Sequence, residues 1–201
     1  MIDLYFAPTS NGRRAAIALE ECGLPYHLHR VELGKPKPEG LLKINPLGAI
    51  PAVVDPDGPG GQPLALTQSA AILLYAAEKS GKFLPSDVAQ RARVHEWLMN
   101  AVTDIGPTSS AIFYINKEGG QHVQSAAEVF EKRLINFFQN IDARLKEVEY
   151  LAGDFSIADL ALISTWLGRQ AMLLKHGPLP HVQRWGEAVA SRTGVQKAMK
   201  L

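Results

Sequence analysis

The stretch from residue 45 to residue 78, NPLGAIPAVVDPDGPGGQPLALTQSAAILLYAAE, places the tightest limits on the fold of this chain. Its pattern predicts a turn, an apolar strand, a loop rich in proline and glycine, a second strand and then a helix. The Ile50-Pro51 step stands where the first strand begins and can offer backbone hydrogen bonds to a ligand. Gln68-Ser69 open the helix, and a helix N-terminus binds anions readily. We therefore expect a site for a small peptide with a carboxylate at one end.

Composition excludes several other classes of protein. The chain has 201 residues, enough for a well-buried core in one or two domains. Its 21 Lys and Arg against 20 Asp and Glu give a formal charge of +1, which argues against a nucleic-acid partner. No apolar run approaches the roughly 18 residues that a membrane span needs, and the opening residues lack the pattern of a signal peptide. With Cys22 as the single cysteine, we expect a soluble, cytoplasmic protein with no membrane partner.

The first 80 residues alternate short apolar runs with helical patterns. Strands are expected at residues 2–6, 26–33, 52–55 and 64–66, with a helix at 12–22 that Gly23 ends. The strand–helix–strand opening predicts a parallel, right-handed unit. The last two strands, joined by DPDGPGGQ, predict a hairpin. Together they predict a small mixed α/β domain.

The rest of the chain is helical in pattern. Apolar residues recur at helical spacing over 94–105 and 127–148, and Gly106-Pro107 should bend the first of these helices. A third helix, 157–172, is apolar nearly all round and should be buried, and a last helix should begin at Pro180. We therefore predict an α/β domain at 1–80, a linker at 81–88 and an all-helical domain at 89–201.

One carboxylate stands on the apolar third helix. Ser156 can cap this helix while Asp159, three residues later, accepts a bond from the Ser156 backbone, as in a capping box. A catalytic Asp159 is the alternative. We expect the structural role, because the spacing from Ser156 suffices to explain the carboxylate.

Four motifs in this order resemble the cytosolic glutathione S-transferase family along essentially the whole chain. They are PTSNG at residues 8–12, NPLGAIPAVVD, LTQSAAILLYAAE and GDFSIADLAL. The opening MIDLYFAPTSNG is most similar to the bacterial Nu class, known chiefly for glutathione-dependent disulfide-bond oxidoreductases. The resemblance implies a thioredoxin-like N-terminal domain, an all-α C-terminal domain, glutathione as co-substrate and a homodimer.

The turn before the first helix is the candidate catalytic site. A thiolate, not a thiol, is the nucleophile, and hydrogen bonds to the charged form lower its pKa. Resemblance to the Nu class implies that Thr9 and Asn11 hold the glutathione thiolate. Ser10 is a rival, because related classes use a serine or cysteine nearby. The alternative is that Thr9 and Asn11 only cap the helix.

The resemblance also implies roles for the Ile50-Pro51 step and for the Gln68-Ser69 helix start. It implies a cis peptide bond at Pro51, with the Ile50 backbone pairing with the cysteinyl backbone of glutathione. Ser69 can bind the γ-glutamyl carboxylate and Gln68 the ammonium group, although many bacterial relatives carry Glu-Ser here. A trans Pro51 that only starts a strand and a Ser69 that only caps its helix are the alternatives.

Other polar residues give weaker signals. The lysines 35, 37 and 43 can reach the glycyl carboxylate, but surface lysines are mostly solvated. Arg13 and Arg14 are equally ambiguous, and Cys22 is expected to be a small core residue. The histidines show no metal-ligand spacing, so no metal is predicted.

These observations predict a glutathione-dependent enzyme that carries out thiol–disulfide exchange. The enzymatic alternative is conjugation of glutathione to small hydrophobic electrophiles. The alternative from another class is a non-catalytic protein-interaction module with the same fold.

Overall fold

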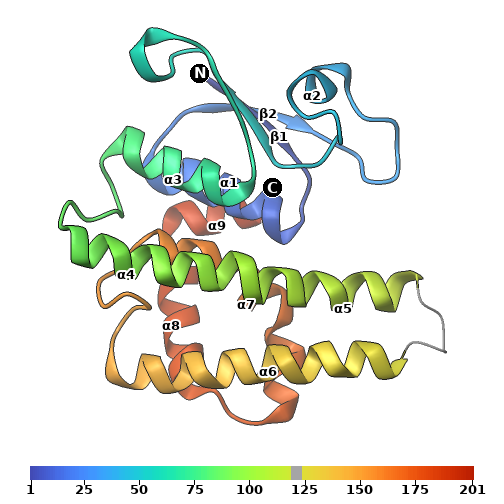
Figure 1. The fold of residues 1–201 in the computed structure, drawn as a ribbon, viewed down its shortest axis with the longest axis vertical. Coiled ribbons are helices and arrows are strands. Elements are labelled where there is room, and N and C mark those ends of the chain that lie inside the picture. The colour runs from blue at the N-terminus through green and yellow to red at the C-terminus, as the bar shows by residue number, and fades with distance from the viewer. Residues whose placement is uncertain (119–123) are drawn as a thin grey trace. The chain divides into compact units, whose positions relative to one another are not determined.

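The computed structural model describes residues 1–118 and 124–201, which form two compact units (Figure 1). One unit comprises residues 1–84 and 191–201, and the other comprises residues 85–190. Residues 191–201 belong with the N-terminal unit because helix α9 (Thr193–Met199) packs on helix α1 (Ser10–Cys22). The domain boundaries drawn from the sequence, at 80 and 89, stay a prediction. They place residues 191–201 in the helical domain, whereas in the structure these residues belong to the N-terminal unit.

The first unit contains a four-stranded mixed sheet in the order β2-β1-β3-β4. Its strands are β1 (Ile2–Phe6), β2 (Tyr26–Arg30), β3 (Ala52–Asp55) and β4 (Leu64–Thr67). Its other helices are α2 (Glu39–Ile44) and α3 (Ser69–Ser80). β1 runs parallel to β2, and β3 pairs antiparallel with both β1 and β4. The expected parallel opening, the hairpin and the thioredoxin-like α/β fold are confirmed.

Side-chain alternation along β1 gives the sheet its two faces. Leu4 and Phe6 are completely buried, whereas Tyr5 between them packs with Leu41 of α2 and Ala52 of β3. Figure 1 shows α1 and α3 on one side of the sheet and α2 on the other. Helices on both sides leave the strand ends as the places where polar groups can collect.

Two glycines fix the ends of α1. Gly23 adopts φ +72° and ends the helix in the left-handed conformation, as predicted. At the other end a Cβ on Gly12 would stand 2.0 Å from the Ala7 carbonyl oxygen. Only glycine therefore allows the start of α1 to lie this close to the turn that leaves β1.

The second strand is shorter than predicted. It ends at Arg30, not at residue 33, because the alternation of buried and exposed side chains does not continue. Val31 turns into the core, Leu33 is exposed, and Gly34 has φ +81°. The apolar Val31 and Leu33 made this part of the sequence look like strand.

The second unit contains α4 (Val88–Met99), α5 (Gly106–Glu118), α6 (Gln124–Glu147), α7 (Ile157–Leu173) and α8 (Pro180–Ala190). A π-helical segment, Asn100–Ile105, lies directly before Gly106-Pro107, and the bend expected at this step stays a prediction. α7 is buried along most of its length, as predicted. α8 begins at Pro180 as expected, but it is not the last helix, because α9 follows it.

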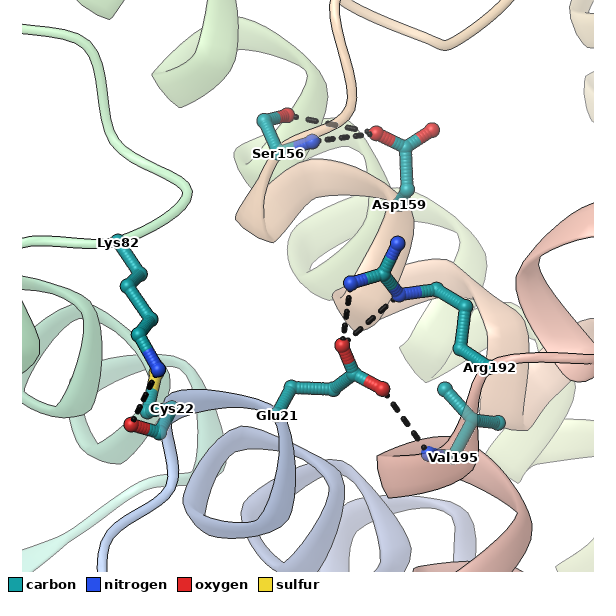
Figure 2. A network of polar contacts seen from close by, with 7 residues as sticks. All are labelled: Glu21, Cys22, Lys82, Ser156, Asp159, Arg192 and Val195. Carbon is teal, nitrogen blue, oxygen red and sulfur yellow. Dashed lines mark hydrogen bonds and ion pairs between the residues drawn. The ribbon is translucent and has the colours of Figure 1, made fainter.

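Asp159 is a structural carboxylate. Ser156 and Asp159 form the predicted capping box, with the Ser156 backbone N–H donating to Asp159 Oδ2 at 3.0 Å (Figure 2). Asp159 Oδ1 also accepts bonds from the Leu151 backbone N–H at 3.1 Å and from Trp185 Nε1 at 2.8 Å. Among residues 1–118 and 124–201, no helix is both long enough and apolar enough to cross a membrane.

Candidate active site

Three chain segments meet at one end of the sheet. Tyr5, Ala52 and Thr67 are paired in one row across β1, β3 and β4. Because β1 and β4 run out of the sheet where β3 enters it, the residues just beyond this row belong to three different loops. The turn that leads to Thr9, the Ile50-Pro51 step and the Gln68-Ser69 helix start therefore lie at the same edge.

Thr9 is the N-cap of α1. Its Oγ1 accepts a hydrogen bond from the Gly12 backbone N–H at 3.1 Å, and its own N–H donates to the Ala7 carbonyl at 2.7 Å. A threonine hydroxyl that accepts one bond still has a hydrogen to donate. The capping role considered in the sequence is therefore present, and it leaves Thr9 able to donate to a ligand as well.

Asn11 lies on the first turn of α1, where its side chain is exposed. Its Oδ1 accepts a hydrogen bond of 2.7 Å from the guanidinium of Arg14, one turn further along the helix. With the oxygen held by Arg14, the amide NH₂ group is the free end of the side chain and can only donate. Ser10, the rival candidate, is the first residue of α1 and is half-buried.

Ser69 is the first residue of α3 and Gln68 is its N-cap. Ser69 is 8% exposed, and its Oγ accepts a 2.8 Å bond from Arg14. Gln68 adopts φ +68° and ψ +116°, a conformation that L-residues rarely take. Strained backbone of this kind is common at ligand sites, because the surrounding fold must hold it in place.

The Ile50-Pro51 peptide bond is cis, as the resemblance implied. Asn45 organises the loop before it: Oδ1 accepts from the Leu47 N–H at 3.2 Å, and Nδ2 donates to the Ala49 carbonyl at 3.0 Å. The Ile50 side chain packs against the small core of Val31, Leu41 and Ala52. This packing holds the Ile50 side chain in place, and with it the backbone of Ile50 at the end of the sheet.

Arg14 is the residue whose place the sequence did not reveal. It is 2% exposed, and burial lowers the pKa of its guanidinium to about 10, so it stays charged at neutral pH. It bonds to Asn11 of α1 and to Ser69 of α3, which joins the two helix starts of the site. The i, i+3 spacing from Asn11 was a usable signal. The link to Ser69 crosses 55 residues and has no local signature.

The weaker candidates lie apart from these contacts. Lys43 forms an exposed ion pair of 2.8 Å with Glu39, and Lys35 is exposed, so a role toward the glycyl carboxylate stays a prediction. Cys22 is buried as expected, and burial raises the pKa of its thiol. Among the described residues, no group of three or more His, Cys, Asp or Glu side chains could hold a metal ion.

The comparisons with known proteins identify the class that this fold and site define. The glutathione S-transferase N-terminal domain matches residues 10–79, and the glutathione S-transferase C-terminal domain matches residues 107–193. The disulfide-bond oxidoreductase YfcG of Escherichia coli is 37% identical over 207 residues, which cover 99% of this chain and 94% of that protein. The chain therefore belongs to the glutathione S-transferase family.

Solved structures agree with this assignment. A glutathione transferase family member from Pseudomonas fluorescens, with two glutathione molecules bound, superposes with a TM-score of 0.89 at 32% identity, covering 98% of this chain and 92% of that one. A glutathione transferase from Pseudomonas putida, with one glutathione disulfide bound per subunit, gives a TM-score of 0.88 at 32% identity, covering 100% and 91%. The family and the two-part fold implied by the sequence motifs are confirmed.

Proposed function

We propose that this protein uses glutathione to reduce disulfide bonds, and that Thr9 and Asn11 hold the reacting thiolate. The observation that carries the proposal is the pattern of hydrogen bonds that these two side chains already make. Each has one acceptor position filled by the protein, Thr9 by the Gly12 N–H and Asn11 by Arg14. Each therefore presents a donor at the start of α1, where the helix dipole also favours negative charge.

Two such donors are enough to change the chemistry of a thiol. Hydrogen bonds to a charged group contribute about 1.5–3 kcal/mol each, and about 1.4 kcal/mol corresponds to one pKa unit. A thiol whose ordinary pKa is above 8 is then largely ionised at neutral pH. The protein supplies no thiol of its own in this scheme, since Cys22 is buried and its pKa is raised.

The remaining candidates position the rest of glutathione. The Ile50 backbone pairs with the cysteinyl backbone next to Pro51, in the manner of a single rung of a sheet. Ser69 donates to the γ-glutamyl carboxylate at the start of α3, and Gln68 accepts from the ammonium group. These three contacts fix the sulfur over the start of α1.

The reaction then proceeds in two exchanges. The thiolate of one glutathione attacks a sulfur of the disulfide RSSR, forming a mixed disulfide and releasing RS⁻, which takes a proton from solvent. A second glutathione thiolate attacks the glutathione sulfur of the mixed disulfide, which gives glutathione disulfide and the second RS⁻. The relatives solved with two glutathione molecules or with glutathione disulfide support this scheme, because those are its reactant pair and its product.

Conjugation of glutathione to an electrophilic carbon is the second candidate. It uses the same thiolate, which attacks a carbon in place of a sulfur, and it needs no second glutathione. The solved relatives are described as glutathione transferases. Parallel assays with 2-hydroxyethyl disulfide and 1-chloro-2,4-dinitrobenzene separate the two. We expect the larger kcat/KM with the disulfide, and a larger value with the aryl halide would make conjugation the main activity.

Single alanine variants of Thr9, Ser10 and Asn11 test the site. We expect Thr9→Ala and Asn11→Ala each to lower kcat/KM about tenfold or more and to move the pH profile toward higher pH, because the thiol pKa rises. Ser10→Ala should change kcat/KM less than about threefold. Ser80→Ala, which removes a hydroxyl at the opposite end of α3, is the matched control. If Ser10→Ala shows the large loss and the other two do not, the assignment of the thiolate-holding pair is wrong.

Retention on immobilised glutathione separates both enzyme hypotheses from a non-catalytic interaction module. We expect the protein to be retained and to be released by free glutathione, whereas a protein that does not bind glutathione would lack both activities. A cytoplasmic location and a homodimer stay predictions, which cell fractionation and light scattering can check.

A further inference from the structure

The arrangement around Arg14 points to a positioning role that goes beyond the two residues facing the thiol. We propose that Arg14 acts as a shared anchor that makes Asn11 and Ser69 hydrogen-bond donors, one toward the thiolate and the other toward the γ-glutamyl carboxylate. This inference rests on the proposed function of the same site. It adds a residue that does not itself touch glutathione.

The geometry of the guanidinium carries the proposal. Arg14 Nη1 donates to Asn11 Oδ1 at 2.7 Å and to Ser69 Oγ at 2.8 Å, two acceptors on two different helices. A guanidinium has only donors and is planar, so each partner must turn an acceptor toward it. Asn11 is then left with its NH₂ group pointing outward, and Ser69 with its hydroxyl hydrogen.

Without Arg14 these orientations would not be fixed. The two ends of an asparagine amide are nearly equal in shape, and an unrestrained Asn11 could present its oxygen to the thiolate, which repels it. An unrestrained serine hydroxyl rotates freely and points its hydrogen to whichever acceptor is nearest. One buried cation thus sets the polarity of both binding groups before glutathione arrives.

The burial of Arg14 agrees with this role. The side chain is 2% exposed, and burial lowers the pKa of its guanidinium. A charge in the protein interior is costly, and anions close by reduce that cost. Glutathione brings two anions, the thiolate and the γ-glutamyl carboxylate, to the two side chains that Arg14 holds. We therefore expect glutathione binding and Arg14 to support each other.

A mutant cycle separates positioning from a general structural effect. The variants are Arg14→Met, the double variant Asn11→Ala with Ser69→Ala, and the triple combination, each checked for native far-UV circular dichroism. In the wild-type background we expect Arg14→Met to lower kcat/KM about tenfold or more and to raise the apparent pKa of bound glutathione, seen as loss of thiolate absorbance at neutral pH. In the double-variant background it should change either value less than about twofold, because the groups it positions are gone.

Two further variants keep the test decisive. Arg13→Met removes the neighbouring, half-buried arginine, and we expect it to change kcat/KM less than about threefold. An equal loss in Arg13→Met would overturn the proposal, because charge alone would then explain it. If Arg14→Met does not fold, Arg14→Lys takes its place in the cycle. It keeps the charge but not the planar donor set, and should cost several-fold in the wild-type background only.

The proposal fails if the loss from Arg14→Met is the same in both backgrounds, or if the wild-type background shows no loss. Glutathione affinity measured by calorimetry runs the same cycle without turnover. Failure of the proposed function would appear as a wild-type protein that binds glutathione but turns over neither substrate. The dependence on Arg14 would still be measured in that case, and it would be contradicted only by additive affinities.

Discussion

Arg14 and Asp159 are both charged side chains almost completely inside the protein, but their partners differ in kind. Asp159 accepts from the backbone of Leu151 and Ser156 and from Trp185, all of them internal groups. Arg14 donates to the side chains of Asn11 and Ser69, which stand at the edge of the proposed site. A charge whose hydrogen-bond partners all lie inside the protein has a structural role. A charge that is hydrogen-bonded to side chains facing a ligand can position those side chains.

Burial acts on the two groups through the same cause with opposite sign. Removal from water disfavours the charged form, so it raises the pKa of Asp159 to about 6 and lowers that of Arg14 to about 10. The hydrogen bonds from Leu151, Trp185 and Ser156 work against this effect at Asp159. Both groups stay charged at pH 7.5. Variants that remove each charge therefore show whether it supports stability or activity.

Replacement of Asp159 should have the largest effect on stability. Asp159→Ala leaves several buried donors without an acceptor, and we expect it to lower the free energy of unfolding by about 3–5 kcal/mol. Turnover per folded molecule should stay unchanged, because no contact of Asp159 reaches the site. Urea unfolding and active-site titration give the two values. The exposed Asp154→Ala is the control and should change stability by less than about 0.5 kcal/mol. A large loss of turnover in folded Asp159→Ala would make that carboxylate functional after all.

Glu21 tests an intermediate case at the other end of α1. Its Oε2 binds Arg192 at 2.7 Å and its Oε1 accepts from the Val195 N–H at 3.2 Å, so it caps α9 from a distance (Figure 2). We expect Glu21→Ala to cost about 1–2 kcal/mol and to speed amide exchange in residues 193–199. Lys197→Ala, on the same helix and with only a 3.9 Å exposed ion pair, is the control and should cost less than about 0.5 kcal/mol. Equal losses in the two variants would show that the bonds of Glu21 to Arg192 and Val195 stabilise the protein no more than an exposed ion pair does.

Replacement of Arg14 should have the smallest effect on stability of the three. Methionine has a similar length, and exchanging a buried ion for an apolar side chain is often neutral or stabilising. Asn11 is exposed, so water can satisfy its released oxygen. We expect Arg14→Met to change the free energy of unfolding by less than about 1 kcal/mol in urea titrations. A loss as large as that of Asp159→Ala would remove the distinction between the two buried charges.

The elements that sequence patterns located correctly are those with local causes. Ser156 and Asp159 are three residues apart, so their capping box is contained in one helical turn. β1, β3 and the C-terminal end of α1 at Gly23 also have the predicted bounds, because alternation and a glycine stop depend on neighbouring residues. The cis bond at Pro51 came from the family resemblance, since proline alone predicts a trans bond.

The expectations that failed are those in which distant contacts override the local pattern. Val31 and Leu33 made this segment look like a strand, but Val31 turns into the core and the strand ends at Arg30. The helix at 193–199 was not expected, and its capping group Glu21 lies more than 170 residues away in the sequence. Neither the end of β2 at Arg30 nor the helix at 193–199 is indicated by the residues next to it in the sequence.

The sequence by itself located the four strands and the longer helices, but not α2 or α9. It also located the turn at Thr9, the Ile50-Pro51 step and the Gln68-Ser69 helix start. It also carried enough motifs to indicate the glutathione S-transferase family. Only the tertiary structure decided that Arg14, and not its neighbour Arg13, joins Asn11 to Ser69. The physical reason is that two adjacent arginines look alike in a sequence, while a helix turns about 100° per residue and buries only one of them between α1 and α3.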